Sequence, residues 1–447
     1  MRLHLGIALI VSALLFGGAT RPDVLAPILP RLVAVASLGI LVAKRELRLR
    51  DWSRIEQSIW LVVLATPALQ LIPLPYGVWT ALPLRDYPRE IFQLMRVEPW
   101  QPLSLSPERT INAWCALIPA FAMYTLARAA DDELVRRWFN ITLLIALLGA
   151  TLGVLQMGGG SGSSLRFYAI TNNDAAVGFF SNANHHGTLL ALAVPLLPVW
   201  AQRFGAPNER PKPIVAFAVI AAASLLAGAA ILTLSRAGVG LFIAASLITL
   251  AATAPKFGRI KRRSGLLAVG GLIALALIAF VSSNSLWRFL GGGESEGRLE
   301  TLPHLLRMLG ETFPFGTGMG AFDPVFRSFE TVARLRFGYL NNAHNDYLQL
   351  LIEAGLAAVV GLAMFLPFAA LILWSAWQDR QRMIRSRRPL ALAGGTAIVV
   401  LLVHSLVDYP LRGAGLSAIF ALSCATLARY WAYRPRRSVG WARVAAE

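Results

Sequence analysis

The sequence predicts an all-α integral membrane protein with about 12 transmembrane helices. Of its 447 residues, 56% are hydrophobic and only 15% are charged, whereas soluble domains carry about 25% charged residues. A helix needs about 20 apolar residues to cross a bilayer, so 12 helices occupy about half of the chain and leave room for long loops. This composition excludes a soluble globular enzyme, a disordered protein and a disulfide scaffold.

Apolar runs predict the helices in order along the chain. The predicted ranges are 3–18, 24–43, 55–74, 109–128, 138–157, 186–204, 213–233, 237–254, 264–282, 353–377, 389–407 and 412–432. They divide the chain into three parts. Residues 1–282 hold the first nine helices, residues 283–344 form a large loop between the ninth and tenth helices, and residues 345–447 hold the last three helices and a basic tail.

The distribution of lysine and arginine predicts that both termini lie in the cytoplasm. The formal net charge is +18, and cytoplasmic loops of membrane proteins collect these residues. All four lysines (Lys44, Lys212, Lys256 and Lys261) and the basic loop 255–263 fall on the side that 12 alternating spans assign to the cytoplasm. Topology therefore accounts for the charge, and no nucleic-acid partner is implied.

The same alternation predicts three long periplasmic loops, at about 75–108, 158–185 and 283–344. Binding and catalysis concentrate in such loops. In the third loop, leucines at helical spacing predict a helix lying on the membrane surface. These leucines are Leu299, Leu302, Leu305, Leu306 and Leu309.

Three arginines on this outer face are candidates for binding an anion. Arg236 begins a span almost without a preceding loop, so its charge lies at the membrane surface, where it needs a partner or a wet cavity. Arg298 and Arg166 lie in the third and second outer loops. Guanidinium groups bind phosphate oxygens in a bidentate manner. The simpler alternatives are a cation that reaches the lipid headgroups, for Arg236, and ordinary loop charges for the other two.

The segment around His344 carries the most chemistry. His344 lies where the third loop joins the tenth predicted span, and Asn345 and Asp346 follow it directly. Glu353 falls inside that span, where an uncompensated carboxylate is costly and indicates a functional or pairing role. His344 is the candidate general base because imidazole exchanges protons near neutral pH. Its alternative role is a hydrogen bond at the start of the helix.

His404 and Asp408 lie one helical turn apart near the outer end of the eleventh predicted span. They either pair with each other as a structural clasp or belong to the site. No metal site is predicted, because the outer loops lack His or Cys clusters at ligand spacing and the adjacent His185 and His186 diverge on a helix. The sequence also lacks a Walker A motif, a dinucleotide fingerprint and a nucleophile elbow.

These residues resemble the O-antigen ligase and polysaccharide polymerase superfamily of bacterial inner membranes. The order and spacing of the matching segments extend from about residue 100 to residue 410. The segments are Pro102-Leu103-Ser104-Leu105-Ser106-Pro107, Asn182-Ala183-Asn184, Leu234-Ser235-Arg236-Ala237-Gly238, Arg298, Pro314-Phe315-Gly316-Thr317-Gly318-Met319-Gly320, Ala343-His344-Asn345-Asp346-Tyr347-Leu348-Gln349 with Glu353 and Gly355, and His404-Ser405 with Asp408. The chain departs from the family at Ala183, where a proline often separates the asparagines.

The resemblance implies a metal-independent glycosyltransferase without a cofactor, in the bacterial inner membrane with its active site facing the periplasm. It implies an undecaprenyl-diphosphate-linked glycan as donor and a hydroxyl of lipid A-core or of another glycan as acceptor. For this chemistry we expect His344 to act as the base, with Asp346 or Glu353 orienting it. We expect Arg236, Arg298 and Arg166 to bind the donor diphosphate, and Asn345 and Asp408 to support the site.

Several alternatives stay open. A polysaccharide polymerase and a protein O-oligosaccharyltransferase share the motifs of a ligase. A small-anion transporter is the main alternative from another class, although transporter sites lie near the membrane midplane and the polar residues here gather at one face. A scaffold without activity would leave His344 and the arginines unexplained.

Overall fold

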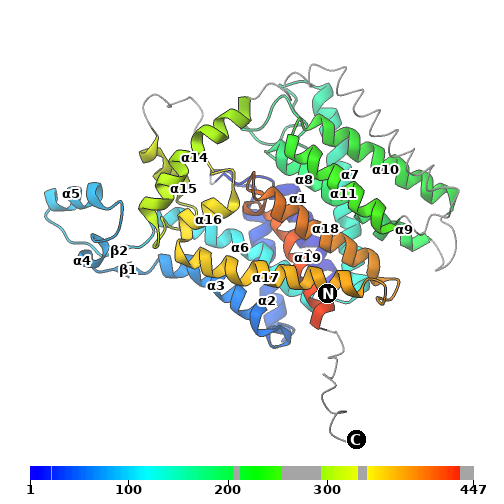
Figure 1. The fold of residues 1–447 in the computed structure, drawn as a ribbon, viewed down its shortest axis with the longest axis horizontal. Coiled ribbons are helices and arrows are strands. Elements are labelled where there is room, and N and C mark those ends of the chain that lie inside the picture. Colours follow the sequence, from blue (N-terminus) through cyan, green and yellow to red (C-terminus); the bar gives the residue numbers. More distant parts are fainter. Residues whose placement is uncertain (22, 205–211, 254–292, 331–339, 433–447) are drawn as a thin grey trace, which may run out of the picture.

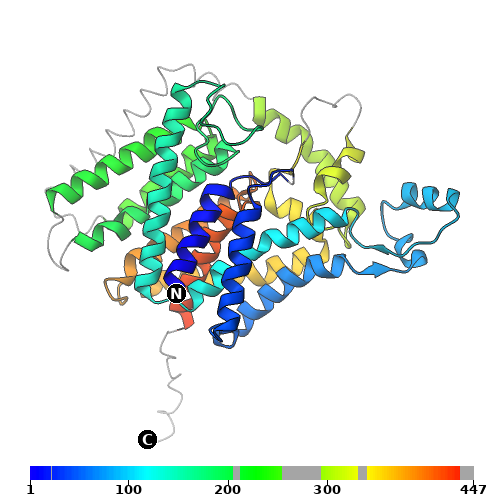
Figure 2. The same cartoon turned by 180° about the vertical axis from the view of Figure 1, so that it is seen from behind.

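The computed structural model of the protein describes residues 1–21, 23–204, 212–253, 293–330 and 340–432, with the backbone alone for 293–300. The described residues are mostly helical (Figures 1 and 2). In chain order the helices are α1 (Arg2–Phe16), α2 (Ile28–Ala43), α3 (Arg54–Gln70), α4 (Tyr76–Trp79), α5 (Asp86–Leu94), α6 (Pro107–Arg128), α7 (Asp132–Gly158), α8 (Ala183–Ala193), α9 (Leu196–Ala201), α10 (Pro213–Leu232), α11 (Arg236–Thr253), α14 (Gly293–Thr312), α15 (Phe322–Phe326), α16 (Asp346–Ala354), α17 (Leu356–Asp379), α18 (Arg387–His404) and α19 (Ala414–Ala432).

Seven described helical segments are long and apolar enough to cross a membrane, and α1 and α2 are shorter apolar helices. Eleven of the 12 predicted ranges overlap described helices. The predicted ninth span, 264–282, lies outside the described residues. The fold is therefore that of a mostly helical multi-pass membrane protein, and the count of 12 spans stays a prediction.

The predicted tenth span begins too early in the chain. A break at Gly355 separates the short helix α16 from the long apolar helix α17, and the φ angle of Gly355 is +55°. A Cβ atom at this residue would lie 2.0 Å from the carbonyl oxygen of Pro314. The close approach requires glycine. Glu353 therefore lies on α16, before the span, and not within it as predicted.

Helix α19 lies at the centre of the bundle and packs against α6, α18, α1 and α17. Small side chains at its contacts, such as Ala421, Ser423 and Ala425, are buried. Small residues let neighbouring helices approach closely in membrane proteins. The bundle is thus built around a helix that exposes little of its surface.

We call the two ends of the bundle the terminal end and the loop end. At the terminal end, α1 begins, α6 ends and α7 begins, and Arg2 joins them by donating from Nη1 to the carbonyl of Ala129 at 2.7 Å. At the loop end, α6 and α8 begin and α18 ends. The described parts of the three long loops predicted from the sequence lie at the loop end. The side of the membrane that each end faces stays a prediction.

The loops at this end form ordered structure. The first carries α4, α5 and a two-stranded antiparallel sheet of β1 (Pro73–Leu74) and β2 (Gln101–Pro102), and it projects from the bundle at the left of Figure 1. The third contains α14, where the leucine spacing predicts a helix. Leu305 and Met308 of α14 are buried in a small hydrophobic cluster with α15 and α16. This cluster holds the third loop against α16.

The segments 102–107 and 314–320, both of which resemble the family, pack against each other. Leu105 donates its backbone N–H to the carbonyl of Thr317 at 2.9 Å. Gly318 has a φ angle of +104°, and a Cβ atom there would lie 2.3 Å from Oγ of Ser104. Gln70, at the end of α3, then donates from Nε2 to the carbonyl of Glu353 at 2.9 Å. The two segments therefore form the base on which α16 rests.

Candidate functional site

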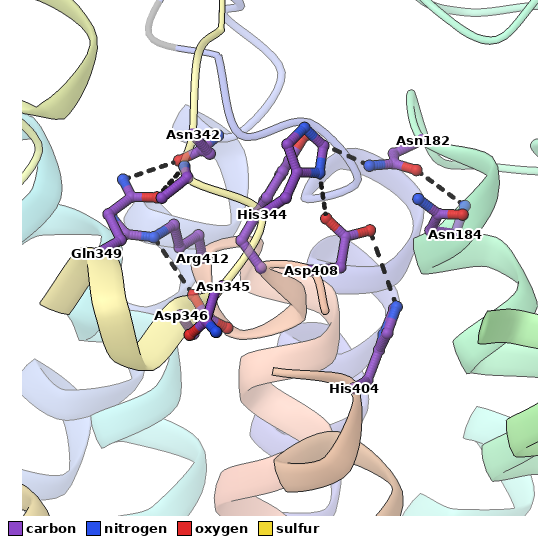
Figure 3. A network of polar contacts seen from close by, with 12 residues as sticks. Asn182, Asn184, Asn342, His344, Asn345, Asp346, Gln349, His404, Asp408 and Arg412 are labelled. Atoms are coloured by element: carbon purple, nitrogen blue, oxygen red, sulfur yellow. Dashed lines mark hydrogen bonds and ion pairs between the residues drawn. The ribbon is translucent and has the colours of Figure 1, made fainter. Parts of the chain in front are cut away.

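The site is built where α16 begins beside the turn that follows α18 (Figure 3). The backbone N–H of Asp346 donates to the carbonyls of Ser405 at 2.9 Å and Asp408 at 3.2 Å. Asn345 caps α16 by accepting the N–H of Leu348 at 2.9 Å, and its Nδ2 donates to the carbonyl of Leu406 at 3.0 Å. These hydrogen bonds bring two segments about 60 residues apart in sequence into one fixed arrangement.

His344 points from this junction toward Asp408. Its Nδ1 lies 3.0 Å from Oδ1 of Asp408, and the exposed fractions of the two side chains are 22% and 0%. The backbone of His344 has a φ angle of +50°. This left-handed conformation is uncommon for a residue other than glycine and persists only where neighbouring contacts enforce it. The fold therefore holds a partly accessible imidazole against a buried carboxyl group.

The pKa of Asp408 determines which ring nitrogen carries the proton. Burial raises this pKa, but the hydrogen bond with His344 and the nearby imidazoles of His185, His344 and His404 outweigh burial and hold it below the ordinary value. Asp408 is therefore a carboxylate at neutral pH, and a carboxylate only accepts hydrogen bonds. It follows that Nδ1 of His344 donates to Asp408 and that Nε2 of the neutral ring keeps a lone pair.

Asp408 also faces a second histidine. Nε2 of His404 lies 3.8 Å from Oδ2 of Asp408, and Nδ1 of His404 lies 2.7 Å from Oγ1 of Thr188 on α8. Of the two roles considered for His404 and Asp408, a mutual clasp and a role in the site, the geometry favours the second for Asp408. Their side chains face each other beyond hydrogen-bond distance, and Asp408 also contacts the candidate base.

An aromatic ring lies behind His344. The ring of Tyr409 has its centroid 5.0 Å from the His344 ring and 5.1 Å from the His185 ring. Asn182 donates from Nδ2 to the Tyr409 hydroxyl at 3.4 Å, and its Oδ1 accepts the N–H of Asn184 at the start of α8. Burial raises the pKa of Tyr409, so its hydroxyl stays protonated. The Asn182-Ala183-Asn184 segment thus reaches the site through Tyr409.

Asp346 and Glu353 both bind Arg412, an arginine that the sequence analysis did not single out. Arg412 lies 3.3 Å from Oδ1 of Asp346 through Nε and 3.0 Å from Oε2 of Glu353 through Nη1. Burial raises the pKa of Asp346 to about 6 although Arg412, which Glu353 shares, opposes this shift. The orienting contact with His344 that we expected from Asp346 or Glu353 is made by Asp408 instead.

Glu353 connects Arg412 to the backbone before His344. Its Oε1 accepts hydrogen bonds from Nε2 of Gln349 at 3.0 Å and from the N–H of Phe322 at 3.3 Å. Gln349 in turn accepts the N–H of Ala343 at 2.8 Å and donates to Oδ1 of Asn342 at 3.1 Å. The carboxylates of α16 therefore fix the segment that carries His344 without contacting its ring.

The three predicted anion-binding arginines occupy different places at the loop end. Arg236 is exposed at the first position of α11. Arg166 donates from Nη1 to the carbonyls of Asn172 at 3.1 Å and Ala175 at 2.9 Å, and so braces its own loop. Arg298 lies in α14, and its side chain is outside the described part of the chain. The structure thus gathers His344, Asn345, Asp346, Glu353 and Asp408 but leaves the arginine set a prediction.

Sequence reasoning missed Arg412, Gln349, Tyr409 and Thr188. One signal pointed to Arg412: Glu353, expected inside a span, needed a cation, and Arg412 lies in a short connection on the same face. Gln349, Tyr409 and Thr188 carried no comparable signal because their roles depend on packing. Among the described residues, no group of three or more His, Cys, Asp or Glu side chains lies close enough to hold a metal.

Comparison with protein families finds one match, which covers part of the chain. The family model described as O-antigen ligase matches residues 221–366. The match begins within α10, ends within α17 and contains His344, whereas Asp408 and Arg412 lie beyond it. A search of curated proteins finds no match. The family match confirms the resemblance to the O-antigen ligase and polymerase superfamily that the sequence motifs predict.

Proposed function

Because part of the chain matches the O-antigen ligase model, we propose that the protein is a glycosyltransferase. In this proposal it moves a glycan from undecaprenyl diphosphate to an acceptor hydroxyl at the periplasmic face of the inner membrane. The family supports an enzyme of the ligase or polymerase type, and the apolar helices support a multi-pass membrane protein. The hydrogen bond between His344 and Asp408 carries the proposal, because it leaves Nε2 of a partly exposed imidazole able to accept a proton.

In the proposed reaction, Nε2 of His344 takes the proton of the acceptor hydroxyl as the hydroxyl oxygen attacks the anomeric carbon of the donor glycan. The bond between that carbon and the diphosphate oxygen breaks, and the electron pair leaves with undecaprenyl diphosphate. Asp408 stabilises the imidazolium that forms and keeps the ring in the required tautomer, as the carboxylate does in a hydrolase triad. A new glycosidic bond and a free carrier lipid result.

The leaving diphosphate carries negative charge, which fixed guanidinium groups stabilise. Arg236, Arg298 and Arg166 are the residues that we propose for this task from the sequence. Arg236 lies exposed at the loop end, the end at which His344 lies. Because the leaving group drives the reaction, the proposal requires neither a metal ion nor a cofactor.

The test is a transfer assay with the full chain reconstituted in lipid, a purified diphosphate-linked donor and an acceptor. His344→Gln should lower the transfer rate about 10²–10⁴-fold, the usual share of general acid–base catalysis. Wild-type activity should fall on the acid side of the pH–rate profile, where the imidazole is protonated and cannot act as a base. EDTA should leave the rate unchanged.

His304→Gln is the matched control, since His304 lies on α14 at the same end but outside the network. A His344→Gln variant as active as wild type would reject the base role. Inhibition by EDTA that a divalent ion reverses would reject the metal-free mechanism. Offering lipid A-core and a lipid-linked glycan as separate acceptors distinguishes a ligase from a polymerase.

A further inference from the structure

Two buried polar side chains lie behind Asp408. His404, on α18, lies on the opposite side of Asp408 from His344 (Figure 3), and Thr188 of α8 contacts His404 in turn. The side chains of Asp408, His404 and Thr188 are all completely buried. A polar group at membrane depth is costly unless it is hydrogen-bonded, and its presence indicates pairing or function. The proposed reaction uses only the oxygen of Asp408 that faces His344, so it leaves His404 and Thr188 without a role.

The hydroxyl of Thr188 determines which nitrogen of His404 carries a hydrogen. Oγ1 of Thr188 donates to the carbonyl of Asn184, one turn earlier on α8, at 2.8 Å. A hydroxyl has a single proton, so Oγ1 can only accept a hydrogen bond from Nδ1 of His404, which lies 2.7 Å away. Nδ1 of His404 therefore carries a hydrogen, and Nε2 is the ring atom that gains or loses a proton.

Nε2 of His404 faces the second oxygen of Asp408. The two atoms lie 3.8 Å apart, which is beyond a hydrogen bond but within the range of an ion pair. Oδ2 of Asp408 accepts no hydrogen bond from the part of the chain that the structure describes, whereas Oδ1 binds His344. A neutral His404 would direct the lone pair of Nε2 at this carboxylate. A protonated His404 directs an N–H group and a positive charge at it.

The other acids near the site already have a cation. Asp346 and Glu353 share Arg412. The charged residues of α7, α17 and α19, which pack against α18, lie at the terminal end, and α9 holds none. A buried carboxylate without a positive partner is strongly destabilising. The charge of Asp408 therefore requires a partner from the remaining neighbours of α18.

Those neighbours are α8 and α11. Arg236 at the start of α11 is exposed, where water and salt screen its charge. On α8, His186 packs against glycines of α7, and the ring centroid of His185 lies 6.5 Å from that of His404. Among the described residues, the nitrogen atoms within 4.0 Å of the Asp408 carboxylate belong to His344 and His404. His404 is thus the cation that the geometry offers to Asp408.

We propose that His404 is protonated in the resting protein and that its charge, placed at Oδ2 of Asp408, keeps the candidate base His344 neutral. The inference rests on the proposed function for the role of His344, and on the hydrogen bonds alone for the charge of His404. A carboxylate with a single imidazole neighbour draws a proton onto that neighbour. Here the carboxylate is balanced from its other side, so Nε2 of His344 keeps the lone pair that a base requires. His404 is a positioning residue that acts through Asp408.

The first test measures the charge of His404 without any transfer reaction. The chain has six histidines, and ¹⁵N solid-state NMR of histidine-labelled full chain in lipid distinguishes an imidazolium from a neutral ring. At about pH 8, where an unperturbed histidine is neutral, wild type should show one imidazolium signal. The signal should vanish in His404→Gln and in Asp408→Asn, and it should persist in His185→Gln and in His344→Gln.

Thr188→Val and Thr188→Ser form a matched pair that decides the test if His404→Gln does not fold. Valine cannot accept the hydrogen of Nδ1, so a neutral ring can carry its hydrogen on Nε2 and donate it to Asp408. The imidazolium signal should then be lost, whereas serine keeps the hydroxyl and should keep the signal. A wild type without an imidazolium, or a signal that persists in Thr188→Val or in folded His404→Gln, would overturn the proposal.

The second test is the pH–rate profile of transfer. His404→Gln removes a positive charge near His344, so the acid limb of the profile should move to higher pH by roughly one unit, the usual effect of one nearby charge. A lower plateau with an unmoved limb would mean a purely structural role and would overturn the proposal. His304→Gln should change neither. If His404 is the imidazolium but wild type transfers no glycan, the proposed function fails while the charge assignment stands.

Discussion

Both ends of the bundle bury carboxylates, but their partners differ. At the terminal end, Glu56 pairs with Arg128 at 2.7 Å, with exposed side-chain fractions of 0% and 5%. At the loop end, the buried Asp408 faces the imidazoles of His344 and His404. Arginine stays charged at any ordinary pH, whereas histidine exchanges its proton near neutrality. The same burial of charge therefore serves structure at one end and is suited to proton transfer at the other.

The loop end contains both kinds of pair side by side. Arg412 binds Asp346 and Glu353 as a fixed clamp, as Arg429 and Arg387 bind Asp132 at 2.6 and 2.7 Å at the terminal end. Only a few residues separate this clamp from Asp408. A rigid ion-pair network next to a histidine–carboxylate pair is what a preorganised active site needs, because the reacting group must keep its position while it changes charge.

The largest difference between the two ends should appear when each loses one carboxylate. Asp408→Asn should lower the transfer rate about 10²–10⁴-fold, because the amide no longer fixes the tautomer of His344. Asp132→Asn should keep the rate per folded molecule but lower the free energy of unfolding by about 1.5–3 kcal/mol, through lost charge-assisted hydrogen bonds. Transfer assays and unfolding in detergent measure the two effects. Similar activity of both variants would remove the distinction.

Replacing the buried arginine at either end, Arg412 or Arg128, should destabilise the protein by a similar amount. Arg412→Gln and Arg128→Gln each leave buried carboxylates unpaired, which costs about 3–5 kcal/mol of unfolding free energy. Arg412→Gln should in addition lower the transfer rate, because Glu353 and Gln349 hold the backbone before His344. Arg128→Gln should not change the rate of the folded fraction. Equal rates for the two folded variants would show that the clamp does not position the base.

The pH dependence of stability should identify Asp346 as the strained member of the clamp. Burial raises its folded-state pKa to about 6, above the ordinary value of about 3.9. The folded state therefore holds this proton more tightly, and the free energy of unfolding should fall by up to roughly 3 kcal/mol as the pH rises from 4 to 7. The difference between wild type and Asp346→Asn isolates this contribution. A difference that does not change with pH would place Asp346 with the fixed ion pairs.

The smallest effect is expected at an exposed pair. Arg307 and Glu311 lie one turn apart on α14, with exposed side-chain fractions of 69% and 39%. Exposed pairs contribute about 0–1 kcal/mol because water and salt screen them. Arg307→Gln should therefore change neither the midpoint of unfolding nor the transfer rate measurably. A loss comparable to that of Arg412→Gln would mean that burial is not what separates the strong pairs from the weak ones.

Much of the fold follows from the sequence because hydropathy is a local property. The predicted apolar ranges agree with both ends of α6, α10 and α11, and with the C-terminal end of α7, to within about two residues. The break at Gly355 was missed, since apolar residues follow it without interruption and the close approach of Pro314 comes from a distant segment. The helix α14 was predicted from leucine spacing, which is again local, and its place on the membrane surface stays a prediction.

The candidate site, like the fold, was predictable from the sequence only in part. The sequence by itself determined the class of protein, the placement of polar residues at helix ends and the choice of His344, because charge near an apolar segment is costly and marks function or pairing. Only the tertiary structure decided that Asp408 and not Asp346 contacts the imidazole, and that Arg412 holds the two acids of α16. The physical reason is geometric: α16, the turn after α18 and the start of α8 converge only when the helices pack, and the left-handed backbone at His344 sets the direction of its ring.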